Sequence, residues 1–450
     1  MNGIGWGGVA RLGLVQAALG AIVVLTTSTL NRVMVVELAL PALLPGVLVA
    51  IHYGLQVLRP RMGFGSDVGG RRTPWIVGGM ALLALGGVVA AAATAWMAEQ
   101  RAAGIALAFA GFVLIGVGVS ACGTSLLVLL AKRVAEPRRA AAATLVWLMM
   151  IAGMACTAGL AGRLLEPYSP ARLLAVAAAV SLGAFAMTLL ALWGVEGRGP
   201  APAAADAEPG RPAFRAALAQ VWAEPAARQF TIFIFVSMLA YSAQDLILEP
   251  FAGSVFGFTP GQSTSLSGVQ HGGALAGMLL AALAGGRFAG RQFGSLRAWT
   301  VGGCITSAAA LLGLVAAGVF GPGWPFKANV FLLGLANGAF AIAAIGSMMR
   351  MAGEGRESRE GVRIGLWGAA QAIAFGLGGM AGAGASDLAK ILLGDPAAAY
   401  ATVFAVEALM FLWAAVLAAR VGRMPAVPAA RVRASRPAAG EPSIAMTEQG

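Results

Sequence analysis

Long apolar runs separated at regular intervals by arginine-containing segments dominate this sequence. Hydrophobic residues make up 59% of the 450 residues, and charged residues make up only 11%. A soluble domain of this size needs a far more polar surface. Most of the runs are about 18–25 residues long, the length of a helix that crosses the hydrocarbon core of a bilayer. We therefore expect an all-α membrane protein.

Twelve membrane-spanning helices are predicted, in two groups of six. The first group covers residues 12–36, 43–58, 74–97, 104–131, 141–162 and 171–195. The second group covers residues 230–248, 263–285, 298–320, 327–349, 364–385 and 398–421. The second span is short for a helix that crosses a bilayer.

Lysine and arginine indicate the orientation, because cytoplasmic loops carry an excess of these residues. Most of the 31 Lys and Arg residues fall in the loops on the side of the two termini. The loops on the other side hold only Arg101, Arg163, Arg172, Lys327 and Lys390. Both termini are therefore predicted to be cytoplasmic. The same pattern accounts for the net charge of +12 without nucleic acid as a partner.

The predicted spans form two bundles, residues 1–195 and residues 230–421, joined by a cytoplasmic linker at 196–229. The linker begins with a Pro/Ala-rich stretch and continues into a segment whose apolar residues share one helical face, which predicts a helix lying on the inner leaflet. That face consists of Phe214, Leu218, Val221 and Trp222. The Pro/Ala/Arg-rich tail, residues 422–450, is predicted to be disordered.

A short motif recurs at the ends of spans 1 and 7. Residues 35–46 read VVELALPALLPG and residues 246–261 read LILEPFAGSVFGFTPG, so that Glu37 and Glu249 correspond. Each motif has a glutamate, then a proline, then a Pro-Gly turn into the next span. Two six-span halves with a long central inner loop are typical of the major facilitator superfamily, in which spans 1, 4, 7 and 10 line a central space.

The inner loop between spans 2 and 3 resembles a loop signature of that superfamily, Gly-x-x-x-Asp-Arg-x-Gly-Arg-Arg. The matching residues are Gly63, Asp67, Gly70, Arg71 and Arg72, and Val68 replaces the first Arg of the signature. The resemblance implies a gating loop that latches the two halves on the cytoplasmic side, with Asp67 accepting hydrogen bonds at a helix N-terminus. A plain basic loop is the alternative interpretation.

Six polar residues interrupt spans 1 and 7, where such residues are costly and usually functional. They are Asn31, Arg32 and Glu37 in span 1, and Gln244, Asp245 and Glu249 in span 7. Arg32 and Glu37 are five residues apart, so on an α-helix they point to different sides. We therefore expect Arg32 to reach Asp245 or Glu249 and form a polar cluster between the halves. Its role would be ligand recognition or a fixed clasp; a set of charges at the outer membrane edge is the alternative.

The two histidines, His52 and His271, fall in equivalent spans of the two halves. A neutral imidazole can bind a metal through one ring nitrogen, which makes both histidines candidate ligands for the magnesium of a chlorophyll-type ring. A single buried histidine is more often a hydrogen-bonded structural residue, and this alternative stays open for both.

Motifs of common enzymes are not found. The sequence has no Walker-type phosphate loop, no HExxH motif and no nucleophile elbow. Cys122, Cys156 and Cys304 lie in predicted spans without CxxC spacing, so we expect them to pack in the helix bundles and not to bind a metal. On these grounds the sequence predicts a protein that is not an enzyme.

Three segments together resemble the bacteriochlorophyll delivery family, a branch of the major facilitator superfamily in phototrophic bacteria that includes PucC-type and LhaA-type assembly factors. They are residues 30–42 (LNRVMVVELALPA), 65–75 (GSDVGGRRTPW) and 244–257 (QDLILEPFAGSVFG). The resemblance covers essentially residues 11–421, and it includes the branch that is sometimes labelled a bacteriochlorophyll synthase subunit.

The resemblance implies a multi-pass protein of the bacterial inner (intracytoplasmic) membrane, surrounded by lipid, that holds bacteriochlorophyll or a precursor as a bound ligand. Its partners would be light-harvesting or reaction-centre polypeptides, with bacteriochlorophyll synthase as a further partner. On this interpretation Asn31, Arg32, Gln244 or Asp245 would bond the ring carbonyls of the pigment, and His52 or His271 would bind its magnesium.

Two other functions stay open. One is a proton-coupled secondary transporter of a small amphiphile, whose uptake would fail when Asp245 or Glu249 is neutralised. The other is a subunit of a bacteriochlorophyll biosynthetic enzyme, which would take part in the turnover of a tetrapyrrole. Pigment that co-purifies with the protein in mild detergent would favour the delivery function.

Overall fold

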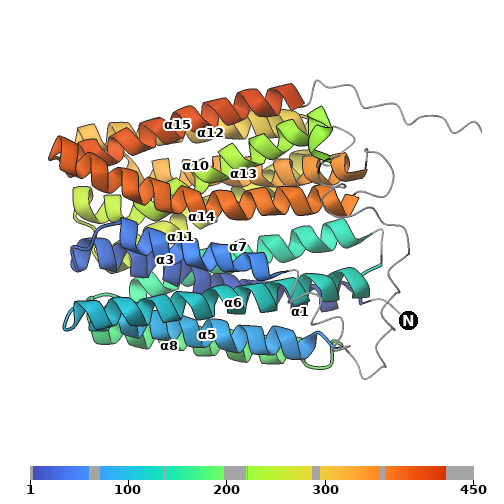
Figure 1. Ribbon diagram of the computed structural model, residues 1–450, viewed down its shortest axis with the longest axis horizontal. Coiled ribbons are helices and arrows are strands. Elements are labelled where there is room, and N and C mark those ends of the chain that lie inside the picture. Colours follow the sequence, from blue (N-terminus) through green and yellow to red (C-terminus); the bar gives the residue numbers. More distant parts are fainter. Residues whose placement is uncertain are drawn as a thin grey trace, which may run out of the picture.

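Long helices run side by side through the whole molecule, which is described by a computed structural model (Figure 1). The structure describes residues 4–59, 71–135, 138–196, 219, 221–285, 294–353 and 360–421. The predicted loop residues Gly63, Asp67 and Gly70 lie outside the described residues. So do the predicted tail after residue 421 and most of the linker, including Phe214 and Leu218.

The first half begins with a continuous helix, Trp6–Glu37, which we call helix 1. Helix 1 consists of α1 (Trp6–Val24), the π-helical segment η1 (Leu25–Thr29), α2 (Leu30–Arg32) and a second π-helical segment, η2 (Val33–Glu37). The other helices of this half are α3 (Leu43–Gly54) with the 3₁₀ turn η3 (Leu55–Leu58), α5 (Thr73–Trp96), α6 (Arg101–Arg133), α7 (Arg139–Leu164) and α8 (Pro170–Leu192).

The second half repeats this pattern of long antiparallel helices. Its elements are α10 (Pro225–Phe256), α11 (Pro260–Gly285), α12 (Leu296–Phe320) with the 3₁₀ turn η5 (Gly321–Gly323), α13 (Phe326–Gly353), α14 (Glu360–Leu393) and α15 (Pro396–Val421).

The prediction of a twelve-helix, all-α membrane protein is confirmed. Within the described residues, 10 helices are long and apolar enough to cross a membrane. The short apolar helix α3, with 12 residues, and the 34-residue α14 complete the twelve predicted spans. The second span is short, as its sequence predicted.

Proline, serine and glycine define several helix ends. Pro170 and Pro225 stand in the first turns of α8 and α10, where a missing N–H costs nothing. Ser169 caps α8 by accepting a hydrogen bond from the backbone N–H of Arg172 at 3.1 Å. Gly257 ends α10 in the left-handed conformation, at φ 68°, which glycine adopts without strain.

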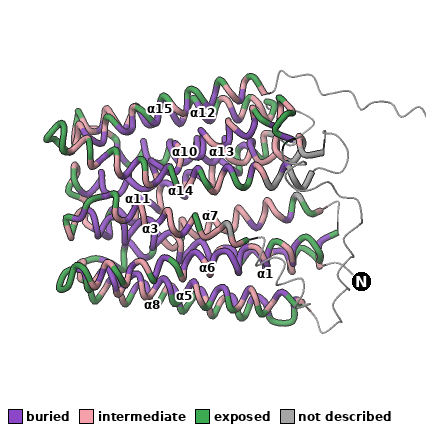
Figure 2. Tube along the Cα trace, viewed as in Figure 1, coloured by how far each residue is buried: buried purple, intermediate pink, exposed green. Residues whose placement is uncertain are grey.

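Each half has an apolar core of its own. Leu12, Phe112 and Leu126 belong to the core of the first half, whereas Phe251 and Phe404 belong to the core of the second. Buried residues concentrate on the helices in the middle of the molecule (Figure 2), and the most apolar windows of helix 1 and α10 are 67% and 72% buried. The predicted domain boundaries stay predictions, because residues 197–218 lie outside the described chain.

Glycines let α11 and α13 approach to backbone contact. A Cβ atom built on Gly277 would lie 1.9 Å from the carbonyl oxygen of Leu335, and one built on Gly334 would lie 2.0 Å from that of Gln270. Such distances leave no room for a side chain, which is the small-residue packing expected between membrane helices. The close contact holds α11, which carries several polar side chains at the interface between the halves, in a fixed position.

The halves pack against each other along two helix pairs, α3 with α14 and α7 with α11, and helix 1 also touches α10 and α11. Small residues line both pairs. A Cβ on Gly261 would lie 2.4 Å from the carbonyl oxygen of Gly162, and one on Gly46 would lie 3.0 Å from the Cβ of Ala383. This interface is where the sequence places its candidate functional residues.

Candidate functional site

Helix 1 departs from α-helical geometry where it faces the second half. Leu25–Thr29 and Val33–Glu37 are π-helical, a rare local geometry that is frequent at functional sites. Side chains in this region bond back to the preceding turn: Thr26 and Thr27 donate to the carbonyl of Val23 at 2.9 and 3.0 Å. Such bonds compete with the regular helix pattern and commonly bend helices.

Arg32 forms an ion pair with Glu37, its neighbour five residues along the same helix. Arg32 Nη1 lies 2.5 Å from Glu37 Oε1, and the two side chains are 3% and 35% exposed. The expectation that these residues point to different sides of the helix is therefore wrong. The reason is the π-helical segment Val33–Glu37, because its i→i+5 hydrogen bonding brings residues five apart onto nearly the same side.

Arg32 also crosses to the second half, but not to a carboxylate. Its Nη2 donates to the carbonyl of Phe258 at 2.5 Å. The guanidinium lies against Gly253 of α10, where an added Cβ would be 3.0 Å from Nη2. The expected bonds to Asp245 or Glu249 are not among the hydrogen bonds and ion pairs of the described residues. Arg32 therefore joins the halves through a backbone carbonyl.

Glu249 of α10 bonds to a different residue of helix 1. Ser28 donates to Glu249 Oε1 and lies 2.9 Å from the hydroxyl of Ser267 on α11. One residue further along helix 1, the hydroxyls of Thr29 and Thr264 lie 2.9 Å apart. Glu249 is only 2% exposed, so its carboxyl group is enclosed between the halves and is not a surface charge at the outer membrane edge.

Asn31 completes the set of contacts between helix 1 and the second half by donating to the carbonyl of Leu246 at 2.5 Å. We call these contacts the polar seam. Its residues are Ser28, Thr29, Asn31, Arg32 and Glu37 of helix 1, with Glu249 of α10 and Thr264 and Ser267 of α11. Asn31 Nδ2 and both Nη atoms of Arg32 donate hydrogen bonds in the seam. Both residues therefore help to hold the halves together.

Asp245 and His271 lie beside the seam. Gln270 Nε2 donates to Asp245 Oδ1 at 3.5 Å, and Asp245 is half-buried. His271 Nδ1 lies 2.8 Å from the carbonyl oxygen of Ser267, which can only accept a hydrogen bond. A neutral His271 therefore carries its proton on Nδ1, and its Nε2 keeps a lone pair that could bind a metal.

His52 has a different environment. It is 2% exposed, and its Nδ1 has no partner in the described part of the chain. Its ring packs edge-on against Tyr53 at 4.7 Å. The two histidines, which lie in equivalent spans, thus have different environments. His271 is held in one tautomer by a backbone carbonyl, whereas the bonding described for His52 leaves its tautomer undetermined.

An aromatic cluster, which the sequence did not predict, spans the interface. The ring of Phe375 on α14 lies 5.1 Å from Tyr53 on α3 and 5.7 Å from Tyr241 on α10. These separations are typical of favourable aromatic pairs. All three residues are half-buried, and Tyr241 is one turn of α10 from Asp245. Two of the four tyrosines of the chain lie inside apolar spans at this cluster, which is the signal that could have identified it.

Methionines and aliphatic residues line the interface along α7 and α11. Ile151 and Met278 form a buried cluster there, with Met150 and Met154 packed against it. Methionine is flexible and polarisable, so it adapts to irregular apolar partners. The interface therefore combines an adaptable apolar surface with a small number of polar groups.

Contacts at the helix ends away from the N-terminus also join the halves. Asp387 of α14 accepts hydrogen bonds from the backbone N–H groups of Ala42 and Leu43, at 3.0 and 2.8 Å. Thr259 donates to the carboxylate of Glu166. With the seam, these contacts join the halves at the helix ends away from the N-terminus.

At the opposite helix ends, a glutamate missed by the sequence analysis caps α5. Glu196, beyond the end of α8, accepts hydrogen bonds from the backbone N–H groups of Arg72 at 2.5 Å and Thr73 at 2.7 Å, at the start of α5. Of the two predicted loop arginines in the described chain, Arg71 is exposed and Arg72 is 6% exposed. Asp67, for which a similar role was predicted, lies outside the described residues. In the described chain, Glu196 accepts hydrogen bonds at a helix N-terminus.

We expect Glu196→Gln to lower stability by about 1 kcal/mol at neutral pH, the usual cost of losing a helix cap. Burial raises the pKa of Glu196, but the hydrogen bonds from Thr73 and Arg72 and the charge of Arg72 outweigh it and hold the pKa below its ordinary value of 4.5. A lowered pKa in the folded state stabilises above the unfolded value, and this contribution is lost as the pH falls through the folded value. The difference between wild type and variant, measured by denaturant unfolding, should therefore shrink below about pH 4.5. A difference that is constant over this range would contradict the capping role.

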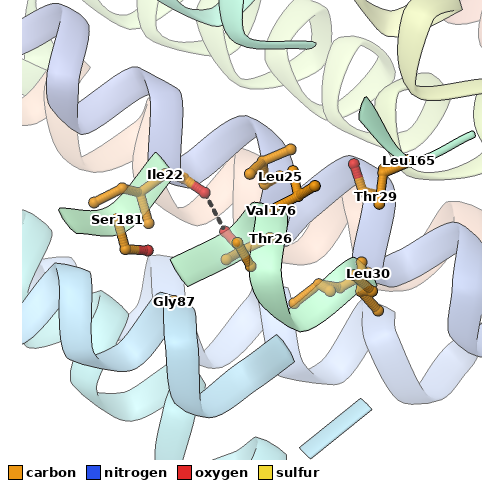
Figure 3. A pocket seen from close by; sticks show the side chains of 11 residues that line it. Ile22, Leu25, Thr26, Thr29, Leu30, Gly87, Leu165, Val176 and Ser181 are labelled. Atoms are coloured by element: carbon orange, nitrogen blue, oxygen red, sulfur yellow. Dashed lines mark hydrogen bonds between the residues drawn. The ribbon is translucent and has the colours of Figure 1, made fainter. Parts of the chain in front are cut away.

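A small cavity lies within the first half, not between the halves. It is lined mainly by aliphatic side chains of helix 1 and α8, such as Ile22 and Val176, and its polar lining includes Thr26 and Ser181. In Figure 3, Thr26 donates to the carbonyl of Ile22 beside the cavity, at 3.2 Å. Its lining comes from the first half only, and it reaches the polar seam at Thr29.

The family of the chain follows from its match to a family model described as PUCC protein, which covers residues 29–425. The chain belongs to the PUCC family. The predicted resemblance to PucC-type proteins is thereby confirmed, and with its membrane-spanning helices this PUCC-family chain is a multi-pass membrane protein.

Two curated relatives extend over most of the PUCC-family chain. The "Bacteriochlorophyll synthase 44.5 kDa chain" of Rhodobacter capsulatus is 54% identical over 418 residues, which is 93% of this chain and 96% of the relative. "Protein PucC" of the same organism is 31% identical, and the match covers 89% of each chain.

The name of the first relative contradicts the prediction that the chain is not an enzyme and indicates an enzyme-associated role. The absence of catalytic motifs was a poor guide, because one chain of a synthase need not carry the reacting groups.

Solved structures confirm the predicted major facilitator fold. The "D-xylose-proton symporter" matches with a TM-score of 0.69 over 92% of this chain and 97% of that chain, at 13% sequence identity. A structure of "proton dependent oligopeptide transporters" matches with a TM-score of 0.67 over 92% of this chain and 98% of that chain, at 15% identity. At these identities the likeness concerns the fold of the PUCC-family chain alone.

Proposed function

We propose that this PUCC-family protein binds bacteriochlorophyll or a precursor at the interface between its halves and delivers it in association with bacteriochlorophyll synthase. Light-harvesting or reaction-centre polypeptides would receive the pigment. The observation that carries the proposal is the 54% identity, over 93% of the chain, to a protein named as a chain of that synthase. The proposed location is the bacterial inner membrane, with both termini in the cytoplasm.

The chemistry of the interface fits such a ligand. Bacteriochlorophyll has a flat conjugated ring with carbonyl groups, a central magnesium and a long apolar tail. The half-buried rings of Tyr53, Tyr241 and Phe375 offer flat apolar contacts to such a ring. Gln270 and the tyrosine hydroxyls can donate to ring carbonyls, and the Met150 region offers an adaptable surface to the tail.

His271 is the better placed of the two histidines for magnesium. The bond from Nδ1 to the carbonyl of Ser267 orients its ring and leaves the Nε2 lone pair free, an arrangement common among metal-binding histidines. Asn31 and Arg32, predicted to bond ring carbonyls, instead use their donors within the polar seam. Their proposed contribution is to fix helix 1 beside the site.

The proposal is tested by purifying the full-length protein in mild detergent from a pigment-producing host and measuring pigment absorption per mole of protein. We expect pigment with the wild type, and several-fold less with Tyr241→Leu or Phe375→Leu, because both variants remove flat apolar contacts. His271→Phe should lose pigment or shift its long-wavelength band, whereas His52→Phe should do neither.

Phe320→Leu is the matched control, because Phe320 is 67% exposed at the outer end of α12, far from the interface cluster in sequence and fold. It should retain wild-type pigment. If wild type and all variants carry the same amount of pigment, or none, the interface is not the pigment site. Synthase activity that co-purifies with wild type would support the association with the enzyme; uptake of a small amphiphile driven by a pH gradient would favour a transporter instead.

A further inference from the structure

Arg11 of helix 1 lies outside the polar seam, at one end of a groove on the surface of the first half. The groove has a volume of about 440 Å³ and runs between helix 1 and α8. Its other lining residues are apolar: Leu14, Gly183, Ala186, Met187, Leu190 and Ala191. A ligand can enter this groove from the surrounding membrane, whereas Gln244, predicted to contact a ligand between the halves, is 0% exposed.

The groove opens toward the lipid around the molecule. α8 packs mainly on α5 and helix 1 of its own half, and it lies with α5 at the opposite edge of the molecule from α15 (Figure 1). Leu14 on one wall and Leu190 on the other are 39% and 72% exposed. Because helix 1 and α8 are long and apolar enough to cross the membrane, these exposed walls are in contact with acyl chains.

Small residues of α8 leave the space that forms the groove. A Cβ atom built on Gly183 meets nothing within 4 Å, and Ala186 is exposed. From Gly183 to Leu190 the groove follows about two turns of α8, or roughly 10 Å. One leaflet contributes about 15 Å to the hydrocarbon core, so the groove can hold most of the part of an acyl chain that lies nearest its headgroup.

The guanidinium of Arg11 is fixed at the level where α8 ends. Its Nε donates to the carbonyl of Ala191 at 2.9 Å, and its Nη2 donates to the carbonyls of Leu190 and Trp193. Trp193, just beyond the end of α8, is 80% exposed, and tryptophan is enriched at the level of the lipid headgroups. Arg11 Nη1 has no hydrogen-bond partner in the described chain, so its N–H groups are free to bind an anion at this level.

Positive charge is in excess at this end of α8. Arg133 Nη2 donates to the carbonyl of Val195 at 3.2 Å, beside the residues that Arg11 contacts. Glu196 comes next in the chain, but its carboxylate already accepts hydrogen bonds from the backbone N–H groups at the start of α5. The two arginines therefore give the end of the groove a charge that is complementary to an anionic headgroup.

We propose that the groove between helix 1 and α8 is a binding site for an anionic phospholipid. One acyl chain lies along Gly183 and Ala186, and the phosphate accepts hydrogen bonds from Arg11 Nη1, with Arg133 adding to the attraction. Such a lipid matches both the apolar walls and the charged end, whereas an apolar helix of another protein would leave Arg11 Nη1 unpaired. The site is separate from the proposed pigment site and does not depend on it.

The test is native mass spectrometry of the full-length protein, delipidated in detergent and titrated with dioleoyl phosphatidylglycerol or dioleoyl phosphatidylcholine. The wild type should bind the first phosphatidylglycerol several-fold more tightly than the first phosphatidylcholine. Arg11→Met should lose most of this preference, because the phosphate loses its hydrogen-bond donors. Gly183→Leu should weaken phosphatidylglycerol binding several-fold, because the new side chain fills the groove. Without lipid it should melt near the wild-type temperature, because the space around its Cβ is open.

Two matched controls should bind phosphatidylglycerol as the wild type does. Arg228→Met removes an exposed arginine near the start of α10, and Gly302→Leu changes an exposed glycine of α12 whose added Cβ meets nothing within 4 Å. If Arg11→Met and Arg228→Met lower the preference equally, the attraction belongs to the net charge and the proposal is wrong. Unchanged lipid binding in Gly183→Leu would show that the groove is not the site. A protein subunit that is lost only from Gly183→Leu, while lipid binding persists, would show a protein-docking groove instead.

Discussion

Glu37→Gln should destabilise the protein more than Arg32→Met, although the first change is at the more exposed residue. Glu37→Gln leaves the guanidinium of Arg32, 3% exposed, without its ion-pair partner, and we expect a loss of about 3 kcal/mol, near the lower end for a broken buried pair. Arg32→Met removes the buried charge itself and leaves Glu37, which is 35% exposed and can be hydrated. Its cost should be about 1.5 kcal/mol, from the lost charge-assisted hydrogen bonds.

The measurement is unfolding of the purified variants in a denaturing detergent, followed by tryptophan fluorescence. The double variant Arg32→Met/Glu37→Gln serves as the control and should be no less stable than Arg32→Met alone, because no uncompensated charge is left. If Arg32→Met costs more than Glu37→Gln, the main counter-charge of Arg32 is another carboxylate, of which Glu249 on α10 is the candidate. If neither single change alters stability or accumulation, the polar seam does not hold the halves together.

Gly277→Ala should disrupt the packing of α11 on α13. The new Cβ would stand 1.9 Å from the carbonyl oxygen of Leu335, a backbone atom that cannot rotate away, so the helices must separate. We expect a loss of about 3 kcal/mol, at the upper end for overpacking. Because α11 also carries Gln270 and His271, bound pigment should fall together with stability.

Gly272→Ala is the matched control on the same helix, because an added Cβ there meets nothing within 4 Å. This variant should be as stable as wild type or more stable by about 0.5–1 kcal/mol, since alanine favours the helix over glycine. Equal losses in the two variants would show that the glycines of α11 act through helix flexibility and not through close packing.

The fold was predictable because its signals are local in the chain. Hydrophobic run length located the spans, including the short α3, and the distribution of arginine marked the loops. Each of these signals reflects the transfer of a single segment from water to lipid, which does not depend on its neighbours. The enzyme-associated role that the name of the 54% identical relative indicates was kept only as an alternative, because such a role concerns a relationship between proteins and not a motif in one chain.

The candidate site was only partly predictable. Spans 1 and 7 were expected to meet through polar residues, and the seam between helix 1 and α10 contains several of them. The predicted partner of Arg32, Asp245 or Glu249, was wrong. The prediction assumed an α-helix, whereas Val33–Glu37 is π-helical and brings Glu37 to Arg32. Glu196 was missed because its capping contact with Thr73 joins residues that are far apart in the chain.

By itself, the sequence determined that this chain spans a membrane with two bundles of six helices and that a few polar residues are buried near their interface. Only the tertiary structure decided which polar groups bond to each other, placed Arg32 and Glu249 in the seam between the halves, and joined Tyr53, Tyr241 and Phe375. The physical reason is that burial in lipid is a property of each segment alone. Hydrogen bonds and ring contacts instead depend on the rotation and register of several helices, which follow from close packing between them.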